Sequence, residues 1–201
     1  MKSLYSLGNV LYINVSHHCH GLSLIQCRGP MFHMPKESGY NAITQPIPAS
    51  EIIRDLTSYL TTKQQPSEIC FAGTGDPLLE LDTVLAVRES LPATIPIRAH
   101  TNGLFEDPEF VAANLANAEF SGLSINLNSA SPSVYEKIMF GSHIPPFHNP
   151  HDKVLSFAEK AIQRSLNVTF TAVSHPDVDL HAVEELAIQF GAGFKQRSYL
   201  I

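Results

Sequence analysis

The chain has 201 residues, a length that fits one domain with a substantial core, and carries a formal charge of −6. Basic runs are absent from the sequence, so we expect no nucleic-acid partner, because tracking phosphates requires clustered lysine and arginine. No apolar stretch is long enough to span a bilayer and no charged-then-apolar leader opens the chain, so we expect a cytoplasmic protein with no membrane partner.

Apolar runs with the two-residue period of a strand alternate along the chain with segments of helical, 3.6-residue period. The predicted strands are Val10–Val15, Ser67–Ala72, Pro96–His100, Gly122–Leu127, Asn167–Val173 and Phe194–Leu200. The predicted helices start at or near Ser50, Asp82, Asp107, Ser131, Asp152 and Asp179, with Ser50, Asp82 and Asp107 as N-caps. Such alternation is typical of parallel strands joined by crossover helices. The sequence therefore predicts an α/β fold, an open (βα)6 partial barrel of the TIM type, in a single domain spanning residues 1–201.

Polar and glycine-rich segments follow four of the predicted strands. They are residues 14–30, Gly73–Pro77, 101–103 and 126–129. Because the carboxyl ends of parallel strands meet at one face, these segments are predicted to share one site.

The turn Gly73-Thr74-Gly75-Asp76-Pro77 is the first candidate for ligand binding, because glycines let the backbone approach a ligand closely. An ordinary strand-to-helix turn is the alternative. The polar residues Asn102, Ser124 and Asn126 are candidates for lining the same pocket, because inward polar side chains in a parallel strand need partners.

Residues 14–30, the cysteine loop, contain three histidines and two cysteines: His17, His18, Cys19, His20 and Cys27. Two cysteines and two histidines are ligands that zinc takes, so a zinc site is one interpretation. A polar loop with one buried thiol, the remnant of an ancestral site, is another. The third cysteine, Cys70, lies inside a predicted strand and is interpreted as a buried structural thiol.

The order of motifs resembles that of the radical S-adenosylmethionine (SAM) proteins, most closely the TatD-associated radical SAM group. The resemblance rests on the cysteine loop after the first strand, F-A-G-T-G-D-P-L-L-E-L-D after the second and H-T-N-G-L after the third. It continues with L-S-I-N-L-N-S-A-S-P-S-V-Y-E-K-I-M, T-A-V-S-H-P-D-V-D and F-K-Q-R-S-Y, and so covers nearly the whole chain.

The resemblance implies a [4Fe-4S] cluster on three cysteines spaced C-x3-C-x2-C, with SAM bound at the open iron and cleaved reductively. Counted from Cys19, the second and third positions hold Ser23 and Gln26, and Cys27 lies one residue beyond. A one-residue insertion would give Cys27 the third role, but the second ligand is then still absent. The motif is degenerate, and Cys19 and Cys27 are its metal-ligand candidates.

The resemblance also implies SAM as a cofactor, with its amino group on the turn after the second strand, where Asp76 replaces the usual glutamate. Arg197 resembles a family position near the SAM carboxylate, and a surface salt bridge is the alternative for this residue.

Three functions follow. The favoured one is a radical SAM-like protein that keeps the fold and a SAM-type small-molecule pocket without cluster chemistry. The first alternative is an active radical SAM enzyme with the cluster on Cys19, Cys27 and a non-cysteine ligand. The second is a zinc-binding module, or one that binds a protein partner. The sequence identifies no substrate.

Overall fold

A computed structural model of the protein describes residues 3–63 and 65–201. One seven-stranded sheet runs through this described part of the chain, with its strands in sequential order. The first pair is antiparallel and every later pair is parallel. The strands are β1 (Leu4–Leu7), β2 (Val10–Ile13), β3 (Glu68–Phe71), β4 (Ile97–Thr101), β5 (Gly122–Asn126), β6 (Asn167–Val173) and β7 (Gly193–Arg197). The predicted α/β fold, an open partial barrel with six parallel strands (β2–β7), is confirmed.

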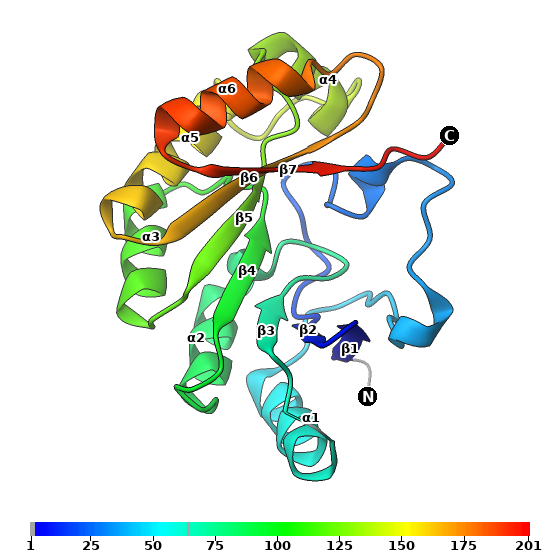
Figure 1. Ribbon diagram of the computed structural model, residues 1–201, viewed down its shortest axis with the longest axis vertical. Helices are drawn as coiled ribbons and strands as arrows, with labels where there is room; N and C mark the ends of the chain where they lie inside the picture. The colour runs from blue at the N-terminus through cyan, green and yellow to red at the C-terminus, as the bar shows by residue number, and fades with distance from the viewer. Residues whose placement is uncertain (1–2, 64) are drawn as a thin grey trace.

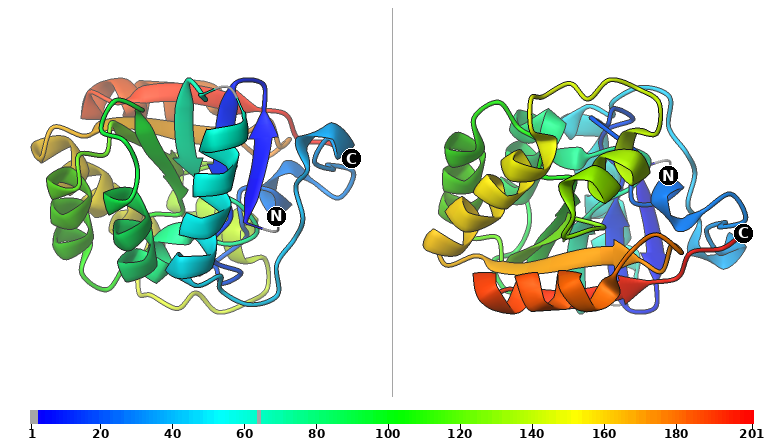
Figure 2. Two further views of the ribbon diagram at one scale, coloured as in Figure 1. Left: turned by 90° about the horizontal axis from the view of Figure 1, so that it is seen from below. Right: turned by 90° about the horizontal axis from the view of Figure 1, so that it is seen from above.

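Helices lie along the outer side of the curved sheet (Figures 1 and 2). The α-helices of the described ranges are α1 (Ala49–Thr62), α2 (Leu81–Glu89), α3 (Pro108–Asn117), α4 (Pro132–Phe140), α5 (Pro150–Gln163) and α6 (Leu180–Phe190), and the short 3-10 turns are η1 (Gln26–Arg28), η2 (Lys36–Ser38) and η3 (Pro77–Glu80). The strands bury alternate apolar side chains in the core; Ile13, Phe71, Ala99 and Ile125 are all fully buried. This apolar layer holds the helices to the sheet.

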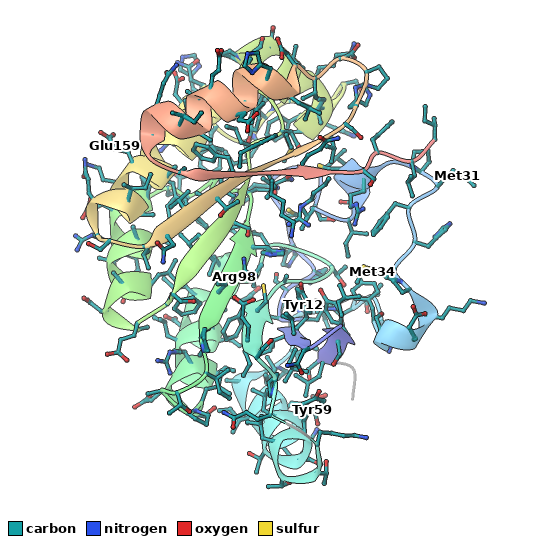
Figure 3. All side chains as sticks on the ribbon, in the orientation of Figure 1. Tyr12, Met31, Met34, Tyr59, Arg98 and Glu159 are labelled. Carbon is teal, nitrogen blue, oxygen red and sulfur yellow. The ribbon has the colours of Figure 1, made fainter. Side chains whose placement is uncertain are left out.

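The other face of the sheet is polar, because alternate residues of each strand point away from the helices. Tyr12 pairs with Cys70, and Cys70 with Arg98, across β2, β3 and β4. One step along β4, His100 pairs with Ser124 of β5. Figure 3 shows the labelled Tyr12 and Arg98 side chains between β7 and the β1–β2 hairpin. This concave face therefore offers polar groups where a closed barrel would hold an apolar core.

Strand β1 was not predicted from the sequence. It forms a hairpin with β2, turning at Gly8, whose φ of 60° lies in the left-handed region that glycine adopts freely. The run Leu4–Leu7 is too short to show a clear two-residue period, which is why sequence periodicity missed it.

Several predicted element boundaries were wrong. Ser50 lies inside α1, whose N-cap is Pro48, and Asp82 lies inside α2, whose N-cap is Glu80. The predicted cap at Asp107 is confirmed, since its side chain accepts a hydrogen bond from the backbone of Phe110.

The segment between β2 and α1 runs along the open side of the sheet, opposite the helices (Figure 1). Its middle is joined to the end of the chain: the Leu200 N–H donates to the Arg28 carbonyl oxygen at 2.8 Å, and the Met31 N–H donates to the Leu200 carbonyl oxygen at 3.3 Å. The cysteine loop is thereby fixed beside β7. None of the helices in the described ranges has the length and apolar character to cross a bilayer.

Candidate functional site

Loops that follow three consecutive strands, β2, β3 and β4, line one cavity on the concave side of the sheet together with residues of β5. Cys19 and Ser23 come from the loop after β2, and Asp76 from the turn after β3. Of the predicted pocket residues, the lining includes Gly73, Gly75, Asp76, Asn102, Ser124 and Asn126, but neither Thr74 nor Pro77. The cavity lies at the carboxyl ends of the parallel strands, as the sequence pattern predicted.

The two glycines of the turn after β3 allow it to pack against the cysteine loop. A Cβ atom added to Gly73 would overlap the Asn14 side chain, and one added to Gly75 would overlap the His18 carbonyl oxygen. The next residue, Asp76, donates its backbone N–H to the same His18 oxygen at 2.7 Å. Close approach of backbone to backbone, which only glycine permits, thus sets the position of the loop.

Thr74 anchors this contact from outside the cavity. Its Oγ1 accepts hydrogen bonds from Asn14 Nδ2 at 3.1 Å and from the Ile43 N–H at 3.0 Å, and it lies 3.1 Å from the Tyr40 hydroxyl. Thr74 therefore joins both ends of the β2–α1 segment to the sheet.

Asp76 holds the next loop in place. Its carboxylate accepts hydrogen bonds from Thr101 Oγ1 at 2.7 Å, from the Asn102 N–H at 2.8 Å and from the Leu78 N–H at 3.0 Å. Only 4 % of Asp76 is exposed, and this burial raises the pKa of its carboxyl group although the three donors act in the opposite direction. The carboxylate is thus a positioning group for the residues around it.

Asparagine amides connect the two thiols of the loop. Asn102 Nδ2 donates to Cys19 Sγ at 3.0 Å, and Asn126 Nδ2 lies 3.2 Å from Asn102 Oδ1 and 3.5 Å from Cys27 Sγ. Asn128 Nδ2 adds a second contact to Cys27 Sγ at 3.4 Å. Each sulfur is therefore already an acceptor for protein amides.

The two cysteines have different surroundings. Cys19 is half-buried and lines the concave cavity, whereas Cys27 is 3 % exposed and lies in a separate hollow beside α4. Burial is the main cause that raises the pKa of Cys19 to about 12 and that of Cys27 to about 11, so both are thiols at neutral pH. Cys70 is fully buried in β3, as predicted for a structural thiol.

Ser23 and Gln26, at the second and third positions of the cysteine motif, pair with each other. The Ser23 N–H donates to Gln26 Oε1 at 2.8 Å, and the Gln26 N–H donates to Ser23 Oγ at 3.4 Å. This reciprocal pattern is a capping box, in which two side chains satisfy the amides at the start of a helical turn. The Cys27 N–H completes the turn on the Ser23 carbonyl oxygen at 2.9 Å.

The histidines of the loop do not assemble a metal site. The rings of His17 and His18 lie against each other with centroids 3.7 Å apart, and His20 Nδ1 is 2.9 Å from the Leu104 carbonyl oxygen. Among residues 3–63 and 65–201, no three histidine, cysteine or acidic side chains come together as metal ligands. The zinc interpretation therefore has no ligand group in the described chain.

Sequence analysis did not single out the residues deeper in the cavity. Tyr5, Tyr12, Arg28 and His100 all line it, beside Arg197, which the resemblance had identified. The alternation of polar side chains along β4 and β7, as in R-A-H and K-Q-R, is the signal that would have identified an inward polar face. The surface salt bridge considered for Arg197 is wrong, since no carboxylate within the described ranges lies within reach of it.

Solved structures share this fold. Streptococcus suis SuiB bound to the precursor peptide SuiA aligns with a TM-score of 0.66 at 16 % identity, over 95 % of this chain and 39 % of that one. AnSMEcpe with bound AdoMet gives a TM-score of 0.66 at 13 % identity, over 95 % and 51 %. Methylornithine synthase (PylB) gives 0.63 at 14 %, over 96 % and 55 %. The chain thus spans about half the length, or less, of these proteins.

No curated protein matches the sequence. The family model described as the radical SAM superfamily matches residues 34–189. The matched range contains Asp76, Asn102 and Asn126 and begins beyond the cysteine loop. Because the match covers more than half of the chain, this protein belongs to the radical SAM superfamily.

Proposed function

We propose that this chain is a radical SAM domain that keeps a SAM-type small-molecule pocket and has lost cluster chemistry. The observation that carries the proposal is the capping box: the side chains at the second and third cysteine positions satisfy the loop's own backbone. A loop that is held by its own hydrogen bonds needs no metal to keep its shape.

The side chains present do not fit a [4Fe-4S] cluster. Such a cluster requires several thiolates facing one point. Here Cys19 lines the concave cavity, while Cys27 is buried beside α4, where the amides of Asn126 and Asn128 contact its sulfur. The described residues supply no third ligand beside them. No reaction step through a cluster is therefore derived for this chain.

The pocket itself supports small-molecule binding. It combines glycine backbone and amide side chains at the rim with aromatic and basic side chains deeper inside, a mixture typical of ligand sites. Structural neighbours described with bound AdoMet or S-adenosylmethionine share the fold, which favours a ligand of that type here. We also propose that the chain resembles the TatD-associated radical SAM group most closely. We further propose a cytoplasmic location, because three free cysteines favour a reducing compartment.

Anaerobic reconstitution with iron and sulfide tests the loss of the cluster. The parent protein should stay colourless and retain far less than one iron per chain after desalting. The Ser23→Cys/Gln26→Cys variant restores C-x3-C-x2-C and should turn brown with roughly four irons per chain. Ser23→Ala/Gln26→Ala is the matched control, because it breaks the capping box without adding thiols. Elemental analysis of the same samples also tests whether the protein binds zinc.

Full, SAM-responsive cluster binding by the parent would overturn the proposal and favour the enzyme, with a non-cysteine group as third ligand. The pocket is tested separately by calorimetry with S-adenosylhomocysteine, which should bind the parent and bind Asp76→Ala more weakly. Absence of any binding by the parent would remove SAM-type ligands from the proposal.

A further inference from the structure

We infer that the deep end of the concave cavity binds the anionic group of a second ligand, a carboxylate or phosphate held between Arg197 and Arg28. This inference rests on the proposed small-molecule pocket and adds the chemical class of a ligand other than SAM. It is carried by buried polar atoms that lack partners and by positive charge that lacks a counter-charge.

Arg197, at the end of β7, is a partly buried cation with no ion-pair partner among the described residues. Its Nε is buried and has no hydrogen-bond partner in the described chain. None of the ion pairs within residues 3–63 and 65–201 includes Arg197. Burial, together with the nearby Arg28, lowers the pKa of the guanidinium. A buried donor without an acceptor is costly, so a ligand that supplies the acceptor would bind here with a large advantage.

Arg28 approaches the same cavity from the cysteine loop. Its guanidinium stacks 3.9 Å from the centroid of the Phe32 ring, and its Nε donates to the Ser198 carbonyl oxygen at 3.3 Å. These contacts fix the plane of the guanidinium and leave its outer N–H groups without partners in the described structure. Arg197, on a strand, and Arg28, on the cysteine loop, thus both contribute guanidinium N–H donors to the lining of the concave cavity.

The lack of acidic partners is unusual for this chain, whose formal charge is −6. Other arginines do find carboxylates: Arg98 pairs with Glu68, and Arg164 pairs with Glu109. The arginines of the cavity are therefore the exception in a protein with acidic residues in excess. Positive potential focused in a recess attracts anions.

The anion site is separate from the rim where SAM-type binding is proposed. The ionisable neighbours of Arg197 include Tyr12, Cys70 and Arg98, which pair with one another in mid-strand. Those of Cys19 are Asp76, in the turn after β3, and Cys27, in η1 of the cysteine loop. His100 Nδ1, a second buried atom without a partner, also belongs to the deep end. The lining of the cavity thus combines one group of thiol and amide side chains with another of arginine, histidine and tyrosine.

The test uses succinate and inorganic phosphate as probes, with neutral succinamide and sodium chloride at matched ionic strength as references. At ten times its Kd, the preferred anion should raise the unfolding midpoint by about 4 °C. Arg197→Gln should weaken binding at least about tenfold, and Arg197→Lys by less, because lysine keeps the charge without the planar fork. Arg54→Gln, on the exposed face of α1, should leave the affinity unchanged. Arg28→Gln provides a second cavity variant in case Arg197→Gln folds poorly.

Preference for succinate over phosphate would identify a carboxylate ligand, and the reverse a phosphate ester; either supports the site. Equal stabilisation by all salts, or equal affinity of the Arg197→Gln and Arg54→Gln variants, would overturn it. Loss of anion binding in saturating S-adenosylhomocysteine would also overturn it, because the anion would then belong to the SAM-type ligand. None of these measurements involves iron, so cluster binding by the parent would defeat the proposed function without deciding this site.

Discussion

The side chains of Ser23 and Gln26 each accept a hydrogen bond from the other's backbone N–H, at 3.4 and 2.8 Å. Counted from Cys19, the resemblance assigns cysteines to these two positions, with Cys27 as the alternative for the third. A metal ligand must direct its sulfur at the metal, whereas these side chains turn back onto their own loop. Under the proposed function, hydrogen bonds between these two residues stabilise the loop where a cluster would otherwise do so.

Replacing Ser23 or Gln26 by alanine should destabilise the protein by about 1 kcal/mol each, the usual cost of losing a helix cap. Because each side chain serves the other's amide, the two losses should not add, and the double-mutant cycle should give a coupling of at least about 0.5 kcal/mol. Urea unfolding measures this. Ser58→Ala, at an exposed position of α1, is the control and should change stability little. Strictly additive losses would show that the pairing carries no energy.

Gly75→Ala should destabilise the protein by about 2 kcal/mol or more, since the new methyl group would overlap the His18 carbonyl oxygen and force the turn and the cysteine loop apart. Binding in the concave cavity should weaken along with stability. Gly193→Ala is the matched control, because the nearest atom to its new methyl group would be Thr169 Oγ1 at 3.2 Å, compared with a backbone oxygen at 2.2 Å for Gly75. Equal effects of the two substitutions in urea unfolding would contradict this account of the turn.

Asp76 should make stability depend on pH in the opposite direction to an ordinary salt-bridged carboxylate. Burial raises its pKa in the folded state above the ordinary 3.8. Below that ordinary value the group is protonated in both states and contributes its full stability; as pH rises through the folded pKa, this contribution is lost. The unfolding free energies of the parent and of Asp76→Asn should therefore be compared from pH 4 to pH 7.5. The free energy of the parent should fall relative to that of the variant as pH rises. If the parent instead becomes more stable relative to the variant, the three hydrogen bonds have a larger effect on the pKa of Asp76 than burial has.

The thiols should react slowly in the folded protein. Since burial raises the pKa of Cys19 to about 12, its thiolate fraction at neutral pH should be on the order of a thousandfold below that of a free cysteine. A thiol-reactive disulfide reagent at pH 7.5 should label three cysteines in denaturant but none rapidly in the native state. The Cys19→Ala variant assigns any slow phase. A fast native phase that disappears in this variant would show an activated thiol.

Much of the fold was predictable because its signals are local. The alternation of apolar strands with amphipathic segments determined the parallel order β2 to β7, and the chain-order rule placed residues 73–76, 102 and 126 at one face. Hairpin strand β1 was missed because four residues carry too little periodicity, and the cap of α1 was misplaced by two residues because proline at position 48 already ends the preceding extended segment.

The role of the turn after β3 could not be predicted in the same way. Gly73 and Gly75 line the cavity as expected, and in addition their absent side chains admit Asn14 and His18 from a loop about 60 residues earlier. The capping box is present in the sequence as S-x-x-Q. The comparison with a cysteine motif treats the same two residues only as missing ligands, so it does not predict the hydrogen bonds between them. The unpaired state of Arg197 required knowledge of which carboxylates lie near it, which only the assembled fold provides.

The bond between Arg28 and Ser198 joins positions 170 residues apart in the sequence. Closing a chain segment of that length costs conformational entropy, which a single hydrogen bond does not offset. The strands and helices can therefore assemble while the deep end of the cavity is still open. A molecule that requires both Arg28 and Arg197 would bind only the fully folded chain. Its binding therefore reports the folded fraction, and it protects the folded protein from proteolysis.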